Sequence, residues 1–265
     1  MITRRTLIRN AAASSAALML PQTVWANAAM TIGTMQIDTL SDGQLTLPPA
    51  MTFGDLPATE LAPILQQYGI APDQTLTPDC NVTLVRDGER TILFDVGAGP
   101  DFMSSAGKLA EAFDALGVSA DEITHVVFTH AHPDHLWGLL DDFDDPVFPN
   151  ATYLIGKAEW DYWINPNTVD TIDTGRTTFA VGAKRRLETL EDNITFFNDG
   201  EEIFPNIAAR GTFGHTPGHM AFQLGAGTDS VMILGDCIGN HHVAFARPDW
   251  ASGSDQDADL GIKTR

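Results

Sequence analysis

The sequence predicts an α/β fold in which helices cover layered β-sheets, and three observations lead to this prediction. Strand pairs joined by turn residues occupy the early part of the chain, whereas strands and helices alternate in the later part. Hydrophobic residues make up 43% of the 265 residues, which is enough to bury a sizeable core. One apolar strand also runs directly into a cluster of polar residues, and α/β folds commonly place reactive groups at such strand ends.

Residues 1–28 have the pattern of an export signal and are not expected to belong to the fold. Arg4 and Arg5 precede the apolar run AAASSAALML, which is too short to span a bilayer. Ala26 and Ala28 then supply the small residues that a signal peptidase accepts. The adjacent arginines resemble a twin-arginine signal. We therefore expect a twin-arginine-type signal peptide at 1–28, a periplasmic domain at 29–265 and no stable membrane anchor; an ordinary secretory signal or a chance basic terminus is the alternative.

The early part of the domain predicts hairpins. Residues 31–47 alternate around Ser41, Asp42 and Gly43, so we expect a hairpin that turns at these three residues. An amphipathic helix is expected at 58–69, ended by the glycine at its last position. Two further strands, NVTLVR and RTILFDVG, are joined by an Asp-Gly pair, which is a second hairpin signal.

The later part predicts alternating strands and helices. GKLAEAFDALG has its apolar residues at helical spacing, and ITHVVFTH is a buried strand. The remaining expected strands are ATYLIG, NITFF, NIAARGTF, AFQLG and SVMILGD, and the remaining expected helices are KAEWDYWI and residues 176–190.

Three histidines and an aspartate fall within six consecutive positions at the end of the buried strand. Alternate side chains of extended backbone point the same way, so His130 and His132 can face one point. Asp134 and His135 are neighbours and should diverge from that pair. Imidazole and carboxylate suit zinc, and four ligands this close crowd one tetrahedral ion. The spacing therefore favours two metal ions, although single histidines more often have no metal.

Two later motifs offer further ligands. His219 follows a Pro-Gly turn in GHTPGH, and Asp236 follows the hydrophobic strand of VMILGD. A carboxylate at the end of that strand can bridge two cations with its two oxygens. Each motif is weak by itself, but the three together in this order are a strong indication of a metal centre.

Together, THAHPDH, GHTPGH and LGD resemble the metallo-β-lactamase superfamily, over roughly residues 31–250. SDGQLTLP, FPNATYLIGKAEWDYW and FARPDW are softer signatures that resemble the secreted branch containing methyl parathion hydrolase and lactonase-like enzymes. The resemblance implies a four-layer αββα sandwich with two zinc ions at one edge. It implies that His130, His132 and His219 hold the first zinc, that Asp134 and His135 hold the second, and that Asp236 bridges them. It also implies that Asp95, in TILFDVGAG, buttresses the metal loop.

The sequence departs from the family pattern near its end. Members of the family supply one more histidine to the second metal well after the bridging aspartate, and no histidine follows His242 here. His241 and His242 stand close behind Asp236 and are the remaining candidates. We therefore expect a C-terminally incomplete domain that lacks the last strand and helix, with a weak second zinc site.

The resemblance implies a zinc-dependent hydrolase in which metal-bound hydroxide attacks an ester, lactone or phosphotriester. Asp134 and Asp236 are the expected catalytic residues, which orient the nucleophile and transfer a proton. The same motif also serves glyoxalase II-like thioesterases and persulfide dioxygenases with one iron. An inactive or binding remnant that lacks the final ligand is a third hypothesis.

A formal charge of −20 repels nucleic acid, so no nucleic-acid partner is expected. The resemblance implies a small-molecule substrate. Trp137 stands just beyond the ligands and Phe53 lies in an early loop, so both are candidates for substrate contact; a place in the core is the alternative for each. The resemblance alone suggests a homodimer. Cys80 and Cys237 are expected to be unpaired thiols, although an oxidising compartment permits a disulfide between them.

Overall fold

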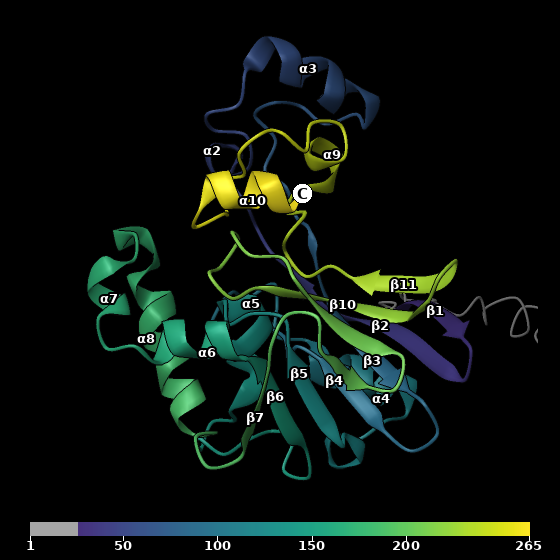
Figure 1. Cartoon of the computed structure of the whole chain (residues 1–265). Helices are drawn as coiled ribbons and strands as arrows, with labels where there is room; N and C mark the ends of the chain where they lie inside the picture. Colours follow the sequence, from purple (N-terminus) through teal and green to yellow (C-terminus); the bar gives the residue numbers. More distant parts are fainter. Residues whose placement is uncertain (1–25) are drawn as a thin grey trace, which may run out of the picture.

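The computed structural model describes residues 26–265, and its centre is a seven-stranded mixed sheet (Figure 1). The strands follow one another in sequence order across this sheet. The first four pair antiparallel, and the fourth to seventh pair parallel. They are β1 (Ala26–Ile32), β2 (Met35–Gln44), β3 (Asp79–Arg86), β4 (Thr91–Phe94), β5 (His125–Phe128), β6 (Thr152–Gly156) and β7 (Ile194–Phe197).

A second, four-stranded antiparallel sheet packs on one face of the first. Its order is β11-β10-β9-β8. The strands are β8 (Glu202–Phe204), β9 (Ile207–Gly211), β10 (Met220–Ala226) and β11 (Asp229–Ile233). The rings of Phe94 and Phe222, one from each sheet, lie 4.9 Å apart in the apolar layer between them.

Some of the helices cover the opposite face of the larger sheet, and others lie beyond one end of the sheets. The helices are α2 (Pro49–Thr52), α3 (Ala58–Gln67), α4 (Leu109–Leu116), α5 (Pro133–Leu136), α6 (Lys157–Ile164), α7 (Thr168–Thr171), α8 (Thr177–Glu188), α9 (His241–Ala244) and α10 (Ala258–Thr264), with short 3₁₀ turns η1 (Ala120–Glu122), η2 (Trp137–Leu139) and η3 (Thr174–Arg176). Helices α4, α6 and α8 contribute Phe113, Trp163 and Leu187 to the core on this face.

The strand β5 shows why its sequence predicts burial on both sides. Val126 and Phe128 belong to the core under the helices, whereas Val127 belongs to the core between the sheets. Successive side chains of a strand point to opposite faces, so a continuous apolar run is needed where both faces are covered. The expectation of an α/β fold with packed sheets and helices is confirmed.

Helices α3, α9 and α10 lie together beyond one end of the two sheets (Figure 1). Leu61 and Leu65 of α3 pack against Val243 of α9 and Phe53 in a small apolar cluster. This brings the C-terminal segment back toward the end of the sheets at which β5 delivers the histidines.

The predicted hairpin turn at Ser41, Asp42 and Gly43 is wrong. Strands β1 and β2 pair through a turn at residues 33–34, and residues 41–43 lie inside β2. The pairing of β2 with β3 shifts register between Ser41 and Gln44, which is a bulge and not a chain reversal. Turn-type residues predicted a reversal, but they serve here to bend a continuing strand.

The bulge turns the carboxylate of Asp42 inward. Asp42 is only 1% exposed and accepts backbone N–H groups of Ala98, Gly107 and Leu109 at 2.8–3.1 Å. Burial raises its pKa, although the same hydrogen bonds act to lower it. A Cβ on Gly97 would come 2.6 Å from the carboxyl carbon, so the loop can approach Asp42 only with glycine at that position.

The predicted signal peptide lies almost entirely outside the described residues, and β1 begins at Ala26. Within residues 26–265, none of the helices combines the length and the apolar character that a membrane crossing requires. Cys80 and Cys237 are both buried and unpaired.

Candidate metal centre

The loop that carries the histidines starts where β5 ends, at the carboxyl edge of the parallel part of the larger sheet. Pro133 then begins the short helix α5, because a proline at the first helical position has no N–H to satisfy there. His130 and His132 stay in the extended segment before the helix, whereas Asp134 and His135 lie on it. The change from extended to helical backbone separates the two pairs, as expected from the sequence.

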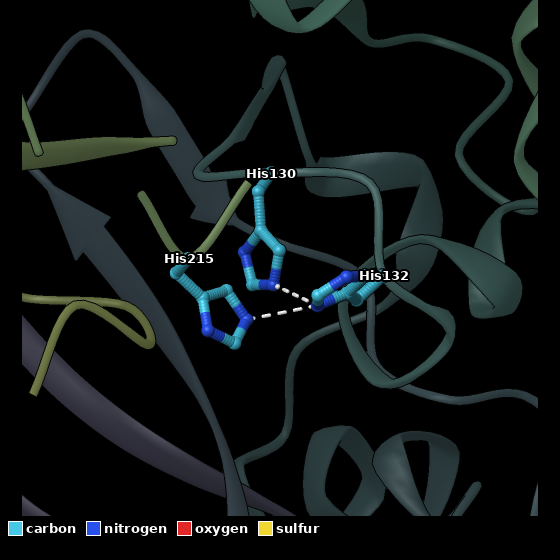
Figure 2. A group of neighbouring side chains, drawn as sticks. All are labelled: His130, His132 and His215. Carbon is cyan, nitrogen blue, oxygen red and sulfur yellow. Dashed lines mark hydrogen bonds between the residues drawn. The ribbon is translucent and has the colours of Figure 1, made fainter. Parts of the chain in front are cut away.

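Three imidazole nitrogens converge in what we call the first ligand group: His130, His132 and His215 (Figure 2). His130 Nε2 lies 3.1 Å from His132 Nδ1, which lies 2.8 Å from His215 Nε2. The three side chains are at most 5% exposed. This compact set of buried nitrogen donors matches the ligands of a zinc site.

The second ligand group consists of Asp134, His135 and Asp236. His135 Nε2 lies 3.4 Å from Asp134 Oδ2 and 3.3 Å from Asp236 Oδ1. The other oxygen of Asp236, Oδ2, lies 3.5 Å from His215 Nε2 in the first group. One carboxylate therefore faces both groups, which is the arrangement that a bridge between two cations needs.

The ligand role expected for His219 does not agree with the structure. His219 is fully buried, and its two ring nitrogens both have protein partners. Its Nδ1 lies 2.7 Å from Thr212 Oγ1, and its Nε2 accepts the backbone N–H of Asp236 at 2.9 Å. His219 thus holds Asp236 in place, while His215 occupies the position in the first group.

His215 is the residue that sequence reasoning missed. GHTPGH contains two histidines four residues apart, and the prediction chose the second because it follows the Pro-Gly turn. The signal for His215 was present in the same motif, but residue type alone does not say which imidazole faces the ligand loop. His219 directly precedes β10, which begins at Met220, and its ring lies against Gly235 and Asp236 in the segment that follows β11. Gly235 allows this contact, since a Cβ there would come 2.6 Å from His219 Nε2.

Burial and charge give the two groups different protonation. Burial lowers the pKa of His130 and of His132 well below the ordinary value, so both are neutral and can donate lone pairs. Burial acts in the same direction on His135, but the carboxylates of Asp134 and Asp236 overcome it and raise its pKa well above the ordinary value. Burial would raise the pKa of Asp236, but the charge of His135 lowers it. The second group therefore favours positive charge at its centre.

The expected support from Asp95 is present. Its Oδ1 accepts the backbone N–H of Thr129 at 2.7 Å, and its Oδ2 accepts the hydroxyl of the same residue at 2.7 Å. Oδ2 also lies 2.8 Å from His135 Nδ1. Metal-binding histidines commonly donate the outer N–H to such a carboxylate, which fixes the ring orientation.

Glu159 of α6 is a second buried carboxylate that sequence reasoning missed. It accepts the backbone N–H of Ala131 at 2.9 Å and of Gly218 at 3.0 Å, and the hydroxyl of Thr216 at 2.7 Å. It also accepts Trp163 Nε1–H at 2.6 Å. Burial raises its pKa, and these four donors oppose the shift. Glu159 therefore ties the loop of His130 and His132 to the loop of His215.

The two candidates for substrate contact have different surroundings. Phe53 is 5% exposed inside the apolar cluster with Leu61 and Val243, so little of its ring is available to a substrate. Trp137 is partly buried and lines a hollow of about 290 Å³ together with Gly182 and Arg186. None of the residues that line this hollow belongs to either ligand group.

The two groups meet the requirements of a metal centre on their donor chemistry. Ligand atoms lie within 4.8 Å of one another in the triad His130–His132–His215, which is the first group, and in the triad His130–His135–Asp236, which joins the two groups. Neutral imidazoles and ionised carboxylates are the ligands that zinc takes in hydrolases. The fold and these residues together define a candidate metal centre of the metallo-β-lactamase type.

The chain belongs to the metallo-beta-lactamase superfamily, whose sequence model matches residues 77–260. It is 27% identical to the N-acyl homoserine lactonase AttM of Agrobacterium fabrum (strain C58) over 128 residues. That match covers 45% of this chain and 43% of the relative, so the compared region spans less than half of the relative's length.

Two solved structures are similar over most of the chain. One is AidC, a dizinc quorum-quenching lactonase in complex with a product, with a TM-score of 0.81, 25% identity and coverage of 91% of this chain and 85% of that chain. The other is the hydrolase AbOPH of the beta-lactamase superfamily, with a TM-score of 0.82, 26% identity and coverage of 92% and 84%.

Proposed function

We propose that this chain is a hydrolase that holds two zinc ions and opens a lactone, with other esters and phosphotriesters as related substrate classes. The observation that carries the proposal is the position of Asp236, whose two oxygens face the two ligand groups. Similarity to the lactonases AttM and AidC favours the lactone. The formal charge of −20 favours an uncharged substrate, because it repels anions.

The residues have distinct tasks in this proposal. His130, His132 and His215 would hold the first ion, Asp134 and His135 would hold the second, and Asp236 would serve both. Zinc supplies a Lewis acid that polarises the carbonyl oxygen and makes water acidic enough to attack at neutral pH.

Asp134 and Asp236 are the members of the centre whose side chains water and substrate can reach from solvent. Their side chains are 15% and 35% exposed, whereas His130 is fully buried. A carboxylate oxygen of either aspartate can orient the attacking water, accept its proton and return that proton to the leaving alkoxide. Because the histidines lie behind them, substrate approaches from the aspartate side.

Metal content is the first test. The purified mature chain is loaded with zinc or iron, dialysed and submitted to elemental analysis. Two zinc ions per chain support the proposal. One iron with consumption of oxygen in the presence of a persulfide would replace it with a dioxygenase, and the absence of any bound metal would indicate a remnant.

Activity is the second test. Acyl homoserine lactones, an aryl ester, a thioester and a diethyl aryl phosphate are offered to the zinc-loaded protein. We expect the highest kcat/KM for a lactone, loss of activity in His215→Ala and retained activity in Glu188→Gln, which changes an exposed carboxylate of α8. Preference for the thioester would overturn the proposed substrate class.

We also propose that the chain acts in the periplasm after export through its twin-arginine signal. The support is the pattern of residues 1–28, with its paired arginines, apolar run and small residues before the domain. Fractionation of cells that express the full chain tests this: Arg4→Lys with Arg5→Lys should leave the protein in the cytoplasm. Unchanged export of that variant would contradict a twin-arginine route.

A further inference from the structure

The segment between α9 and α10 lies directly against the loop of His215. Gln256 N donates to the carbonyl oxygens of Gly214 at 3.0 Å and His215 at 3.1 Å, and Asp257 N donates to Gly214 at 2.9 Å. Gly214 has a φ of 125°, and a Cβ there would come 2.3 Å from the backbone of Gly261 in α10. The C-terminal segment is therefore joined to a ligand loop by backbone contacts.

This segment places the carboxylate of Asp255 behind His215. Asp255 Oδ2 accepts Arg265 Nη1–H at 2.7 Å, and Arg265 Nη2 donates to the carbonyl of Trp250 at 2.9 Å. The side chains of Asp255 and Arg265 are 1% and 2% exposed. The ion pair therefore holds the carboxylate rigidly in a buried position.

The second oxygen of Asp255 faces an unpaired nitrogen. Oδ1 lies 3.7 Å from His215 Nδ1, and among the described residues neither atom has a hydrogen-bond partner. Buried polar atoms are nearly always paired, because an unpaired one loses its hydrogen bonds to water without replacement. A shift of a few tenths of an ångström brings these two atoms within hydrogen-bond distance.

The outer nitrogens of the other ligand histidines already have partners. His130 Nδ1 lies 3.0 Å from Thr129 Oγ1, and His135 Nδ1 lies 2.8 Å from Asp95. His132 Nε2 lies 3.3 Å from the side-chain amide of Gln256, the neighbour of Asp255. His215 is the member of the set whose outer nitrogen still needs an acceptor.

A neutral imidazole that presents Nε2 to a metal carries its proton on Nδ1. A carboxylate that accepts this proton in a hydrogen bond fixes the tautomer, orients the ring and increases the basicity of Nε2. We propose that Asp255, held by Arg265, is the positioning residue that sets the metal affinity of the first ligand group through His215. This inference rests on the proposed function.

The test compares Asp255→Asn with Asp257→Asn. Asp257 lies in the same segment, but its exposed side chain caps α10 by accepting the N–H of Leu260 at 2.9 Å, a role that asparagine can fill. Zinc dissociation constants are measured for the wild-type protein and both variants by competition with a chelator. We expect Asp255→Asn to weaken the tighter zinc site by roughly 10- to 100-fold and Asp257→Asn to leave it within about twofold of wild type.

Removal of Asp255 leaves the buried Arg265 without its partner and can unfold α10. The double variant Asp255→Asn with Arg265→Gln removes both charges and allows the two amides to hydrogen-bond. Thermal unfolding without metal shows whether each variant folds. Weak zinc binding in the folded double variant supports the proposal, whereas recovery of wild-type affinity would show that the ion pair serves only to hold α10.

A spectroscopic measurement observes His215 itself. In the cobalt-loaded protein, the Nδ1 proton of His215 gives a shifted exchangeable resonance, whose exchange with solvent should be faster in Asp255→Asn. Equal exchange and equal zinc affinity in wild type and Asp255→Asn would overturn the inference. If wild-type protein fails to bind zinc at all, the proposed function fails and not this inference alone.

Discussion

The two ligand groups face the same aspartate, Asp236, but differ in charge and exposure. The first group contains three buried imidazoles, and burial keeps His130 and His132 neutral. The second contains two carboxylates around His135, and the side chain of Asp236 is 35% exposed. The first group would therefore hold a cation through the geometry of its nitrogen lone pairs, whereas the second would attract a cation through charge.

This difference explains where the supporting contacts lie. Neutral ligands gain affinity when their rings are held in fixed orientation, and the first group has Glu159 between its two loops and Asp255 behind His215. The second group depends on fewer such contacts, with Asp95 behind His135. Substitutions should therefore disturb the first group through positioning and the second through charge.

The largest effect is expected from the two histidines of GHTPGH. His215→Ala removes a ligand of the first group and should lower kcat/KM by roughly a thousandfold, with loss of one zinc ion per chain. His219→Gln keeps an acceptor for the N–H of Asp236 and a donor to Thr212, so it should retain both ions. Steady-state kinetics and elemental analysis measure both results. Loss of zinc from His219→Gln and retention in His215→Ala would restore the original assignment of His219 as ligand.

Glu159→Gln should disturb the first group without touching its ligands. The amide retains one oxygen acceptor but turns an NH₂ group toward N–H and O–H donors, which should cost about 2–4 kcal/mol in the free energy of unfolding. Chemical denaturation measures this loss. Zinc affinity should fall at the first group and stay unchanged at the second, which Glu159 does not contact.

The matched control is Glu188→Gln, which makes the same chemical change at an exposed residue of α8. Glu188 pairs with Lys184 at 3.8 Å, and loss of this surface pair should change stability by about 0.5 kcal/mol or less. Equal losses for both variants would mean that the four hydrogen bonds of Glu159 contribute little.

The second group should respond to pH in metal-free protein. The pKa of His135 is raised in the folded state, so its charge contributes stability that is present below about pH 6.5 and is lost as pH rises through the folded pKa. The lowered pKa of Asp236 keeps its carboxylate ionised throughout this range. The difference in unfolding free energy between wild type and Asp236→Asn should therefore be larger at pH 6 than at pH 10. A difference that grows with pH would contradict the assigned charge of His135.

The sequence was sufficient for the fold and for most of the centre because those features follow from local pattern. The apolar run of β5, the cluster that starts at His130 and the aspartate after β11 each fix one ligand position near a strand end. The choice between His215 and His219, the clamp by Glu159 and the contact of Asp255 depend on which loops meet in space. Neither the hydrophobic periodicity nor the residue types of the sequence specify contacts between loops that are distant in the chain. The bulge at Asp42 was not predicted for the same reason, because its carboxylate binds backbone groups of a distant loop.

The smallest effects are expected from substitutions of Phe53 and Trp137, both of which the sequence predicted as candidates for substrate contact. Phe53 packs between α3 and α9, so Phe53→Leu should lower the free energy of unfolding by about 1 kcal/mol and leave KM unchanged. Trp137 Nε1 has no hydrogen-bond partner among residues 26–265, so Trp137→Phe should cost little stability. If the hollow beside Trp137 receives part of the substrate, the same change should raise KM by roughly two- to fivefold for long acyl chains. A KM that depends on Phe53 and not on Trp137 would place the substrate near α3 and not in the hollow beside Trp137.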